Sequence, residues 1–199
     1  MKLYKQTTEY TCAVSSLMMI LHSYSKDVKL NRETEFKIWQ ETVNLPTRAP
    51  SIYGLAHFAV KKGFNVKVLV EEREYNYPDY RFKGYTKKEI DEAKYMSKLH
   101  AKNLGKANVK VEEREILPKE IISNLQAGHK LLVRVNAGIF RETGSTSKYL
   151  AFIYENHSFK VYDPKKGVLE TTKKDIVESL ETLKSKKKRD KRVIIFYDS

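Results

Sequence analysis

The sequence predicts an α+β fold, in which N-terminal helices pack on an antiparallel sheet formed by the C-terminal part of the chain. Residues 12–24 and 30–43 carry apolar side chains at helical spacing. Near the end of the chain, two strand-like segments at 148–154 and 158–164 are separated only by a short turn. Helices at the front and adjacent antiparallel strands at the back are typical of α+β proteins.

Length and composition favour one domain spanning residues 1–199. The chain has 199 residues, of which 41% are hydrophobic, enough to bury a sizeable core. The start of the chain is polar, and no apolar run approaches the length of a membrane span. We therefore expect a cytoplasmic protein without a membrane partner.

Cysteine and histidine usage argues against a disulfide framework and against a metal site. The chain has a single cysteine, and its five histidines show none of the close pairings that zinc sites use. We expect no metal and no cofactor.

Local signals place the remaining elements. Asn31 is a candidate N-cap, and Gly63 is expected to end a short helix before a strand at 65–70. Thr86 and Glu89 form a capping box for a helix that reaches about residue 104. The sequence also predicts a helix that begins near residue 118 and ends at residue 128, strands at 130–135 and 192–197, and a helix at 175–183.

The net charge of +13 raises the question of nucleic acid. Seven basic residues and one acidic residue lie in the run KSKKKRDKR at 184–192, whereas charges elsewhere are mixed. We favour a solvated charged turn over a nucleic-acid site for this run. Tyr75, Tyr77, Tyr80 and Tyr85 also lie near basic residues, but without a nucleic-acid motif we interpret them as packing residues rather than as stacking platforms.

Cys12 is the candidate nucleophile because it stands where the first helix begins. Unpaired backbone N–H groups and the helix dipole stabilise a thiolate at such a position. Gln6, six residues earlier, carries an amide that could help to hold an oxyanion. The alternative is that Cys12 is a small core residue of an apolar helix.

Several short motifs, taken in order, resemble a known family. Gln6, the segment TTEYTC ending at Cys12, and the following SSLMMIL resemble the start of papain-like cysteine peptidases, specifically the relatives of double-glycine leader peptidases. Tyr53-Gly54-Leu55 matches a YGL-like motif of that family, and Asp163-Pro164 matches the end of its late hairpin. The resemblance implies a papain-like α+β domain over most of the chain.

The resemblance also implies roles for individual residues. By this resemblance, Cys12 stands at the position of the family's nucleophile and Gln6 at that of its oxyanion-hole donor. Asp163 stands at the position of the residue that orients the base. Where the family has its catalytic histidine, this sequence has Lys148. A lysine charge beside Cys12 would favour the thiolate, but a protonated lysine cannot activate water. His157 lies in the predicted hairpin turn, at the wrong end of the strand to replace the histidine.

Three functions follow from these residues. The leading one is a thiol-dependent peptidase or amide-bond acyl-transfer domain that uses Cys12, Gln6, Lys148 and Asp163 on a peptide or protein substrate. The first alternative is a catalytically silent papain-like domain that binds a peptide or protein in the cleft where an active peptidase would hold its substrate. The less favoured alternative is a basic nucleic-acid-binding protein. The excursion between residues 71 and 115 is where we expect specificity to reside.

Overall fold

A computed structural model describes residues 1–75, 77 and 82–197 of the chain. One seven-stranded sheet, in the order β2-β1-β7-β3-β4-β5-β6, forms its centre. All neighbouring strands are antiparallel except β1 and β2. The strands are β1 (Val66–Val70), β2 (Val111–Glu113), β3 (Lys130–Asn136), β4 (Ser147–Glu155), β5 (Ser158–Asp163), β6 (Gly167–Thr171) and β7 (Arg192–Phe196).

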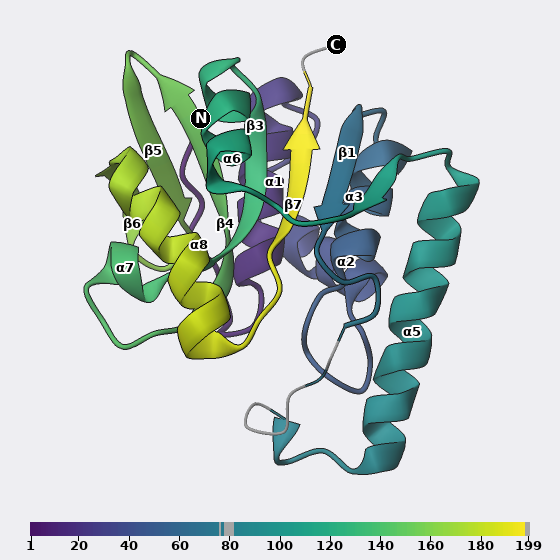
Figure 1. Ribbon diagram of the computed structural model, residues 1–199. Helices are drawn as coiled ribbons and strands as arrows, with labels where there is room; N and C mark the ends of the chain where they lie inside the picture. The colour runs from purple at the N-terminus through teal and green to yellow at the C-terminus, as the bar shows by residue number, and fades with distance from the viewer. Residues whose placement is uncertain (76, 78–81, 198–199) are drawn as a thin grey trace.

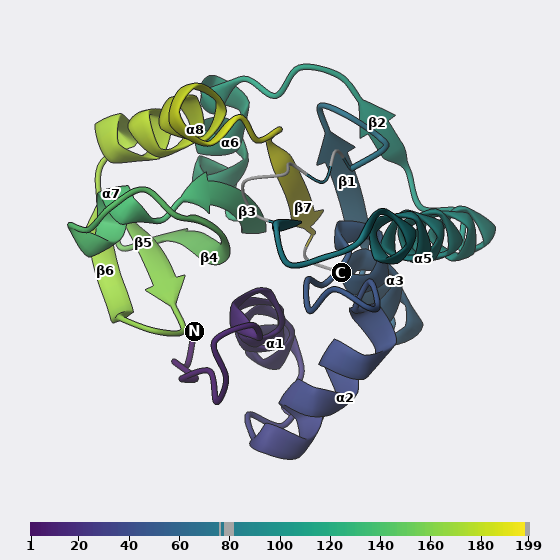
Figure 2. The same cartoon turned by 90° about the horizontal axis from the view of Figure 1, so that it is seen from below.

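Helices cover both faces of this sheet (Figures 1 and 2). α1, α2 and α3 lie on one side, α6, α7 and α8 lie on the other, and α5 runs along the β1–β2 end of the sheet (Figure 2). The helices are α1 (Cys12–Tyr24), α2 (Arg32–Thr42), α3 (Ile52–Lys61), α5 (Lys87–Lys106), α6 (Pro118–Gln126), α7 (Gly138–Arg141) and α8 (Lys173–Lys187). The predicted α+β class is confirmed, with the helix that carries Cys12 packed on a largely antiparallel sheet.

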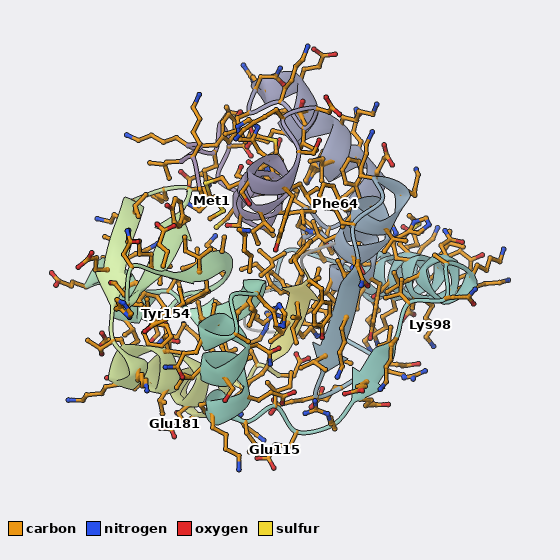
Figure 3. All side chains as sticks on the ribbon, turned by 90° about the horizontal axis from the view of Figure 1, so that it is seen from above. Met1, Phe64, Lys98, Glu115, Tyr154 and Glu181 are labelled. Atoms are coloured by element: carbon orange, nitrogen blue, oxygen red, sulfur yellow. The ribbon has the colours of Figure 1, made fainter. Side chains whose placement is uncertain are left out.

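Alternating side chains of the strands supply two apolar cores, one on each face of the sheet. Leu132 and Ala151 face the core under α1 and α3, whereas Leu131 and Phe152 face the core under α6 and α8. Side chains fill the space between the layers, and the labelled Met1 and Phe64 lie beside α1 (Figure 3). The helix α1 is therefore buried along most of its length, which fixes the position of its first residue.

Two capping signals that act over a few residues gave the correct helix starts. Asn31 caps α2 through Thr34 N, and Thr86 forms the predicted capping box with Glu89 at the start of α5. His157 is an exposed residue of the turn between β4 and β5, as expected. The sequence analysis did not anticipate the strands β2 and β6 or the four-residue helix α7.

The aromatic residues of the excursion pack against one another. The ring of Tyr75 meets that of Tyr77 edge-on at 4.6 Å, and Tyr77 meets Phe82 at 5.0 Å between centroids. Tyr85 packs on Phe82 at 5.9 Å, and Tyr80 lies outside the described residues. This cluster accords with packing rather than with a stacking platform for bases.

The interpretation of the basic run 184–192 as a solvated turn is wrong for its second half. Lys184, Lys186 and Lys187 belong to α8 and Lys188 is exposed, but the basic residues after Lys188 turn inward. Arg189, Lys191 and Arg192 are all buried, at 6% exposure or less. The Lys191 amine pairs at 3.2 Å with Glu71, which is far away in sequence. Arg192 forms an ion pair with its neighbour Asp190 and donates to the distant Glu72 carbonyl at 2.8 Å.

Glu35 of α2 is a buried carboxylate that ties the N-terminal segment to α1. It accepts hydrogen bonds from the Tyr4 hydroxyl at 3.0 Å, the Thr7 amide at 3.0 Å, the Thr7 hydroxyl at 2.7 Å and the Ser15 hydroxyl at 3.0 Å. Burial acts to raise the pKa of Glu35, but hydrogen bonds from Thr11, Thr7 and Ser15 outweigh it and hold the pKa below its usual value. The carboxylate thereby fixes the segment between Tyr4 and Cys12.

We expect Glu35→Gln to lower the free energy of unfolding by about 1–3 kcal/mol at pH 7, because an amide cannot accept all of these hydrogen bonds. A carboxylate with a lowered pKa contributes stability above its unfolded pKa and loses it as the pH falls through the folded one. The difference between parent and variant in urea titrations should therefore shrink below about pH 4.5. A difference that stays constant from pH 7 to pH 3 would contradict this role.

Candidate active site

The sulfur of Cys12 lies at the junction between α1 and β4. Cys12 is only 3% exposed, and its thiol donates to the Tyr149 carbonyl at a sulfur–oxygen distance of 3.5 Å. The Ser16 hydroxyl, one turn further along α1, donates to the same carbonyl at 3.2 Å. The main chain of β4 thus holds Cys12 as a protonated donor rather than as an exposed thiolate.

Strand register brings Lys148 and Asp163 to the same face of the sheet. Phe152 of β4 is paired with Val161 of β5, and side chains alternate between faces along each strand. Lys148 therefore shares a face with Phe152, and Asp163 shares that face with Val161. The core on this face also contains Cys12, so the structure brings Cys12, Lys148 and Asp163 into one neighbourhood.

The partner of Asp163 is an arginine that the sequence analysis missed. Arg141, the last residue of α7, donates from Nε to Asp163 Oδ2 at 2.6 Å and from a terminal nitrogen to Oδ1 at 2.9 Å. Asp163 is completely buried and also accepts the Lys165 amide at 2.8 Å. This bidentate ion pair uses an acceptor position on each carboxylate oxygen and places a permanent positive charge beside Asp163. The sequence carries no signal for it, because α7 has only four residues and no amphipathic pattern.

Burial dominates the electrostatics of the thiol. It raises the pKa of Cys12 from the ordinary 9.0 to about 11, although the positive charge of Lys148 acts to lower it. The carboxylate of Asp163 raises the pKa further, and Arg141 lowers it through its charge and through a contact with the sulfur. Two cations therefore act on Cys12 without ionising it at neutral pH.

Gln6 is close to this neighbourhood through its main chain. Its amide N–H donates to the Pro164 carbonyl at 3.1 Å, next to Asp163. Its side-chain Nε2 donates to the Thr8 carbonyl at 2.6 Å, while Oε1 is buried without a hydrogen-bond partner. The predicted role of Gln6 as an oxyanion donor stays a prediction.

All five histidines lie among the described residues, and their contacts place them elsewhere. His22 Nδ1 is 2.8 Å from the Val28 carbonyl, and His100 Nε2 is 3.2 Å from the Val43 carbonyl. His129 packs edge-on against the ring of Tyr197, His57 belongs to α3, and His157 is in the β4–β5 turn. Arg141 and Lys148, rather than an imidazole, accompany Cys12 and Asp163.

Comparison with known proteins identifies the family of this chain. The model of the Peptidase_C39 like family matches residues 1–191. The chain belongs to this family. Its membership confirms the resemblance based on Gln6, Cys12 and the Asp163-Pro164 dipeptide.

Comparisons with solved structures and with curated proteins add no further family assignment. The crystal structure of the Pseudomonas avirulence protein AvrPphB is similar over 98% of this chain and 95% of that chain, with 14% sequence identity and a TM-score of 0.40. No curated protein matches the chain.

Within the described ranges, no group of three or more histidine, cysteine, aspartate or glutamate residues could hold a metal ion. In the same part of the chain, no helix is long and apolar enough to cross a membrane.

The raised pKa of Cys12 predicts a pH dependence of stability that Cys12→Ser removes. A thiol whose pKa is raised on folding contributes stability below its unfolded pKa of about 9 and loses it as the pH approaches 11. The parent should therefore lose about 2–3 kcal/mol more than Cys12→Ser between pH 8.5 and 11. Urea titrations of both proteins across this range measure the difference, and parallel curves would show that the thiol is not shifted.

Proposed function

We propose that this member of the Peptidase_C39 like family binds a peptide segment of another protein beside Cys12 and does not hydrolyse it. The observation that carries the proposal is the bidentate ion pair between Arg141 and Asp163. In a cysteine peptidase, a base takes the thiol proton and later activates water. Here the carboxylate that would orient such a base is paired with the Arg141 guanidinium, and a guanidinium cannot accept a proton.

The state of the thiol supports the same proposal. With a pKa of about 11, only about one Cys12 in several thousand is ionised near pH 7.5. Its proton is donated to the Tyr149 carbonyl, which cannot take it away. Lys148 stands in the strand position that the family gives to histidine, and an ammonium group does not accept the proton of a hydrolytic water.

Binding is supported by what the fold leaves open around Cys12. The side chain of Thr11 does not cap α1, so it leaves the first amides of the helix to other acceptors. A cavity lined by Cys12, Ala13, Tyr149 and residues of the excursion adjoins them. A peptide carbonyl is a suitable acceptor for such amides, and the excursion supplies walls for a side chain.

A second candidate is the thiol-dependent peptidase or acyl-transfer activity predicted from the sequence. The charges of Lys148 and Arg141 both lower the pKa of Cys12, and they would stabilise a thiolate once a bound substrate has moved the thiol proton. In this function an amine of the substrate takes the acyl group, because lysine does not activate water. Cys12, Gln6, Lys148 and Asp163 would then act as the sequence analysis assigned them.

Hydrolysis of an activated thiol-reactive ester separates the two functions. We expect the parent to release product no faster than Cys12→Ala at pH 7.5. We also expect Lys148→His to bring no gain, because Asp163 stays paired with Arg141, whose positive charge opposes protonation of the new imidazole. General acid–base catalysis in a working triad contributes about a hundredfold or more, so a restored site would be easy to detect.

Each variant has a matched control for folding, the circular dichroism spectrum and thermal midpoint of the same preparation. Product release by the parent that Cys12→Ala abolishes would contradict the binding proposal and support acyl transfer. A hundredfold gain in Lys148→His that depends on Cys12 would show that Asp163 is available after all.

A further inference from the structure

The cavity beside Cys12 has a volume of about 230 Å³ and a cationic floor. Arg134 of β3 and Arg192 of β7 line it, and both are at least nine-tenths buried. The excursion contributes Tyr75 and Tyr77 to its walls, so the cavity lies where the sequence predicted specificity. On α5, Lys98 (labelled in Figure 3) pairs with Glu74 at 2.9 Å and fastens the excursion.

The two floor arginines share one carboxylate. Arg134 donates to Asp190 at 2.7 Å, and Arg192 forms an ion pair with the same residue. Two buried guanidinium groups on one carboxylate leave one positive charge in excess within this trio. Both guanidiniums also lie over the ring of Tyr75, at 5.1 Å and 5.4 Å from its centroid, and such aromatic contacts do not neutralise a charge. A buried excess charge is costly unless an anion compensates it.

Buried polar atoms without partners line the same cavity. The Ser51 hydroxyl and the Tyr75 hydroxyl are buried and have no hydrogen-bond partner among the described residues. Ser51 is only 4% exposed and precedes α3 without capping it through its side chain. The side-chain oxygen of Asn44 is a third such atom, while its nitrogen donates to the Tyr77 hydroxyl at 3.2 Å. Two hydroxyl donors and one amide acceptor are therefore available to a ligand.

We propose that this cavity binds a carboxylate of the peptide, with the Ser51 and Tyr75 hydroxyls as donors and the Arg134–Arg192 pair as the compensating charge. This inference rests on the proposed function. It names the class of peptide that is bound: a segment that places an acidic side chain or a free C-terminus in the cavity. The Asn44 oxygen accepts an N–H of the same segment, a group that a peptide has and an inorganic anion lacks.

A nucleic-acid strand does not fit these observations. Arg134 and Arg192 are 6% and 2% exposed, so a phosphate backbone running over the surface does not reach them. The rings of Tyr75 and Tyr77 pack edge to face, an arrangement that does not offer two parallel faces between which a base could stack. Only a group of side-chain size enters the cavity.

Titration of the full-length protein with capped pentapeptides tests the proposal, with chemical shifts in ¹⁵N-labelled protein as the readout. One probe is acetylated and amidated Ala-Ala-Glu-Ala-Ala, and its matched control carries Gln in place of Glu. A third peptide, acetylated penta-alanine with a free C-terminus, distinguishes a terminal carboxylate from a side-chain carboxylate. We expect the Glu peptide or the free-terminus peptide to bind about tenfold tighter than the Gln peptide.

Two conservative variants locate the site. Ser51→Ala and Tyr75→Phe each remove one hydroxyl that has no partner in the part of the chain that the structure describes, so both should keep the parent's thermal midpoint. Each should weaken the carboxylate peptide severalfold and leave the Gln peptide unaffected. Ser185→Ala on α8 and Tyr95→Phe on α5 make the same chemical changes at exposed positions outside the cavity and should leave binding unchanged.

The outcomes separate this inference from the proposed function. Equal binding of the Glu, Gln and free-terminus peptides at the residues around Cys12 would overturn the carboxylate site and leave peptide binding intact. If no peptide changes any chemical shift of the protein, both the carboxylate site and the proposed peptide binding are overturned. Tight carboxylate binding that Ser51→Ala and Tyr75→Phe do not weaken would place the anion elsewhere and overturn the site.

Discussion

The buried ion pair between Arg141 and Asp163 is the interaction on which the rest of this site depends. Asp163 ends β5 and accepts the amide of Lys165, so the turn that follows is folded around its charge. The carbonyl of Pro164 in that turn accepts the amide of Gln6 and holds the N-terminal segment against the sheet. Removing either partner would leave an uncompensated buried charge, which typically costs about 3–5 kcal/mol.

Burial, more than this ion pair, sets the protonation state of Cys12. The start of a helix stabilises an anion by only about 0.3–1 kcal/mol at exposed sites. A rise of the pKa from 9.0 to about 11 corresponds to about 2.7 kcal/mol in the opposite direction, so desolvation outweighs the helix. A histidine oriented by Asp163 would shift this balance by removing the proton, but Arg141 holds that carboxylate. In this member of the Peptidase_C39 like family, Lys148 and Arg141 are the charged groups that act on the thiol together with Asp163.

Much of the fold could be predicted because its signals are local. Thr86 and Glu89 mark the start of α5 within four residues, and the turn between β4 and β5 joins strands that are adjacent in sequence. The family motifs also placed Cys12, Lys148 and Asp163 near one another. Local signals failed where partners are distant: Arg141 and Asp163 are 22 residues apart, and Arg192 meets Glu72 across 120 residues. Charge density at 184–192 predicted exposure, whereas tertiary partners determine burial.

The Raman spectrum can show whether Cys12 is a protonated thiol in the folded protein at neutral pH. Because the chain has a single cysteine, its S–H stretching band in the Raman spectrum reports on this residue alone. We expect this S–H band to be present at pH 7.5 and to be narrowed by the single hydrogen bond to the Tyr149 carbonyl. The band should disappear only as the pH approaches 11. Absence of the band at pH 7.5 in folded protein would reveal a thiolate paired with Arg141 or Lys148. That result would contradict a silent site and make Cys12 an activated nucleophile.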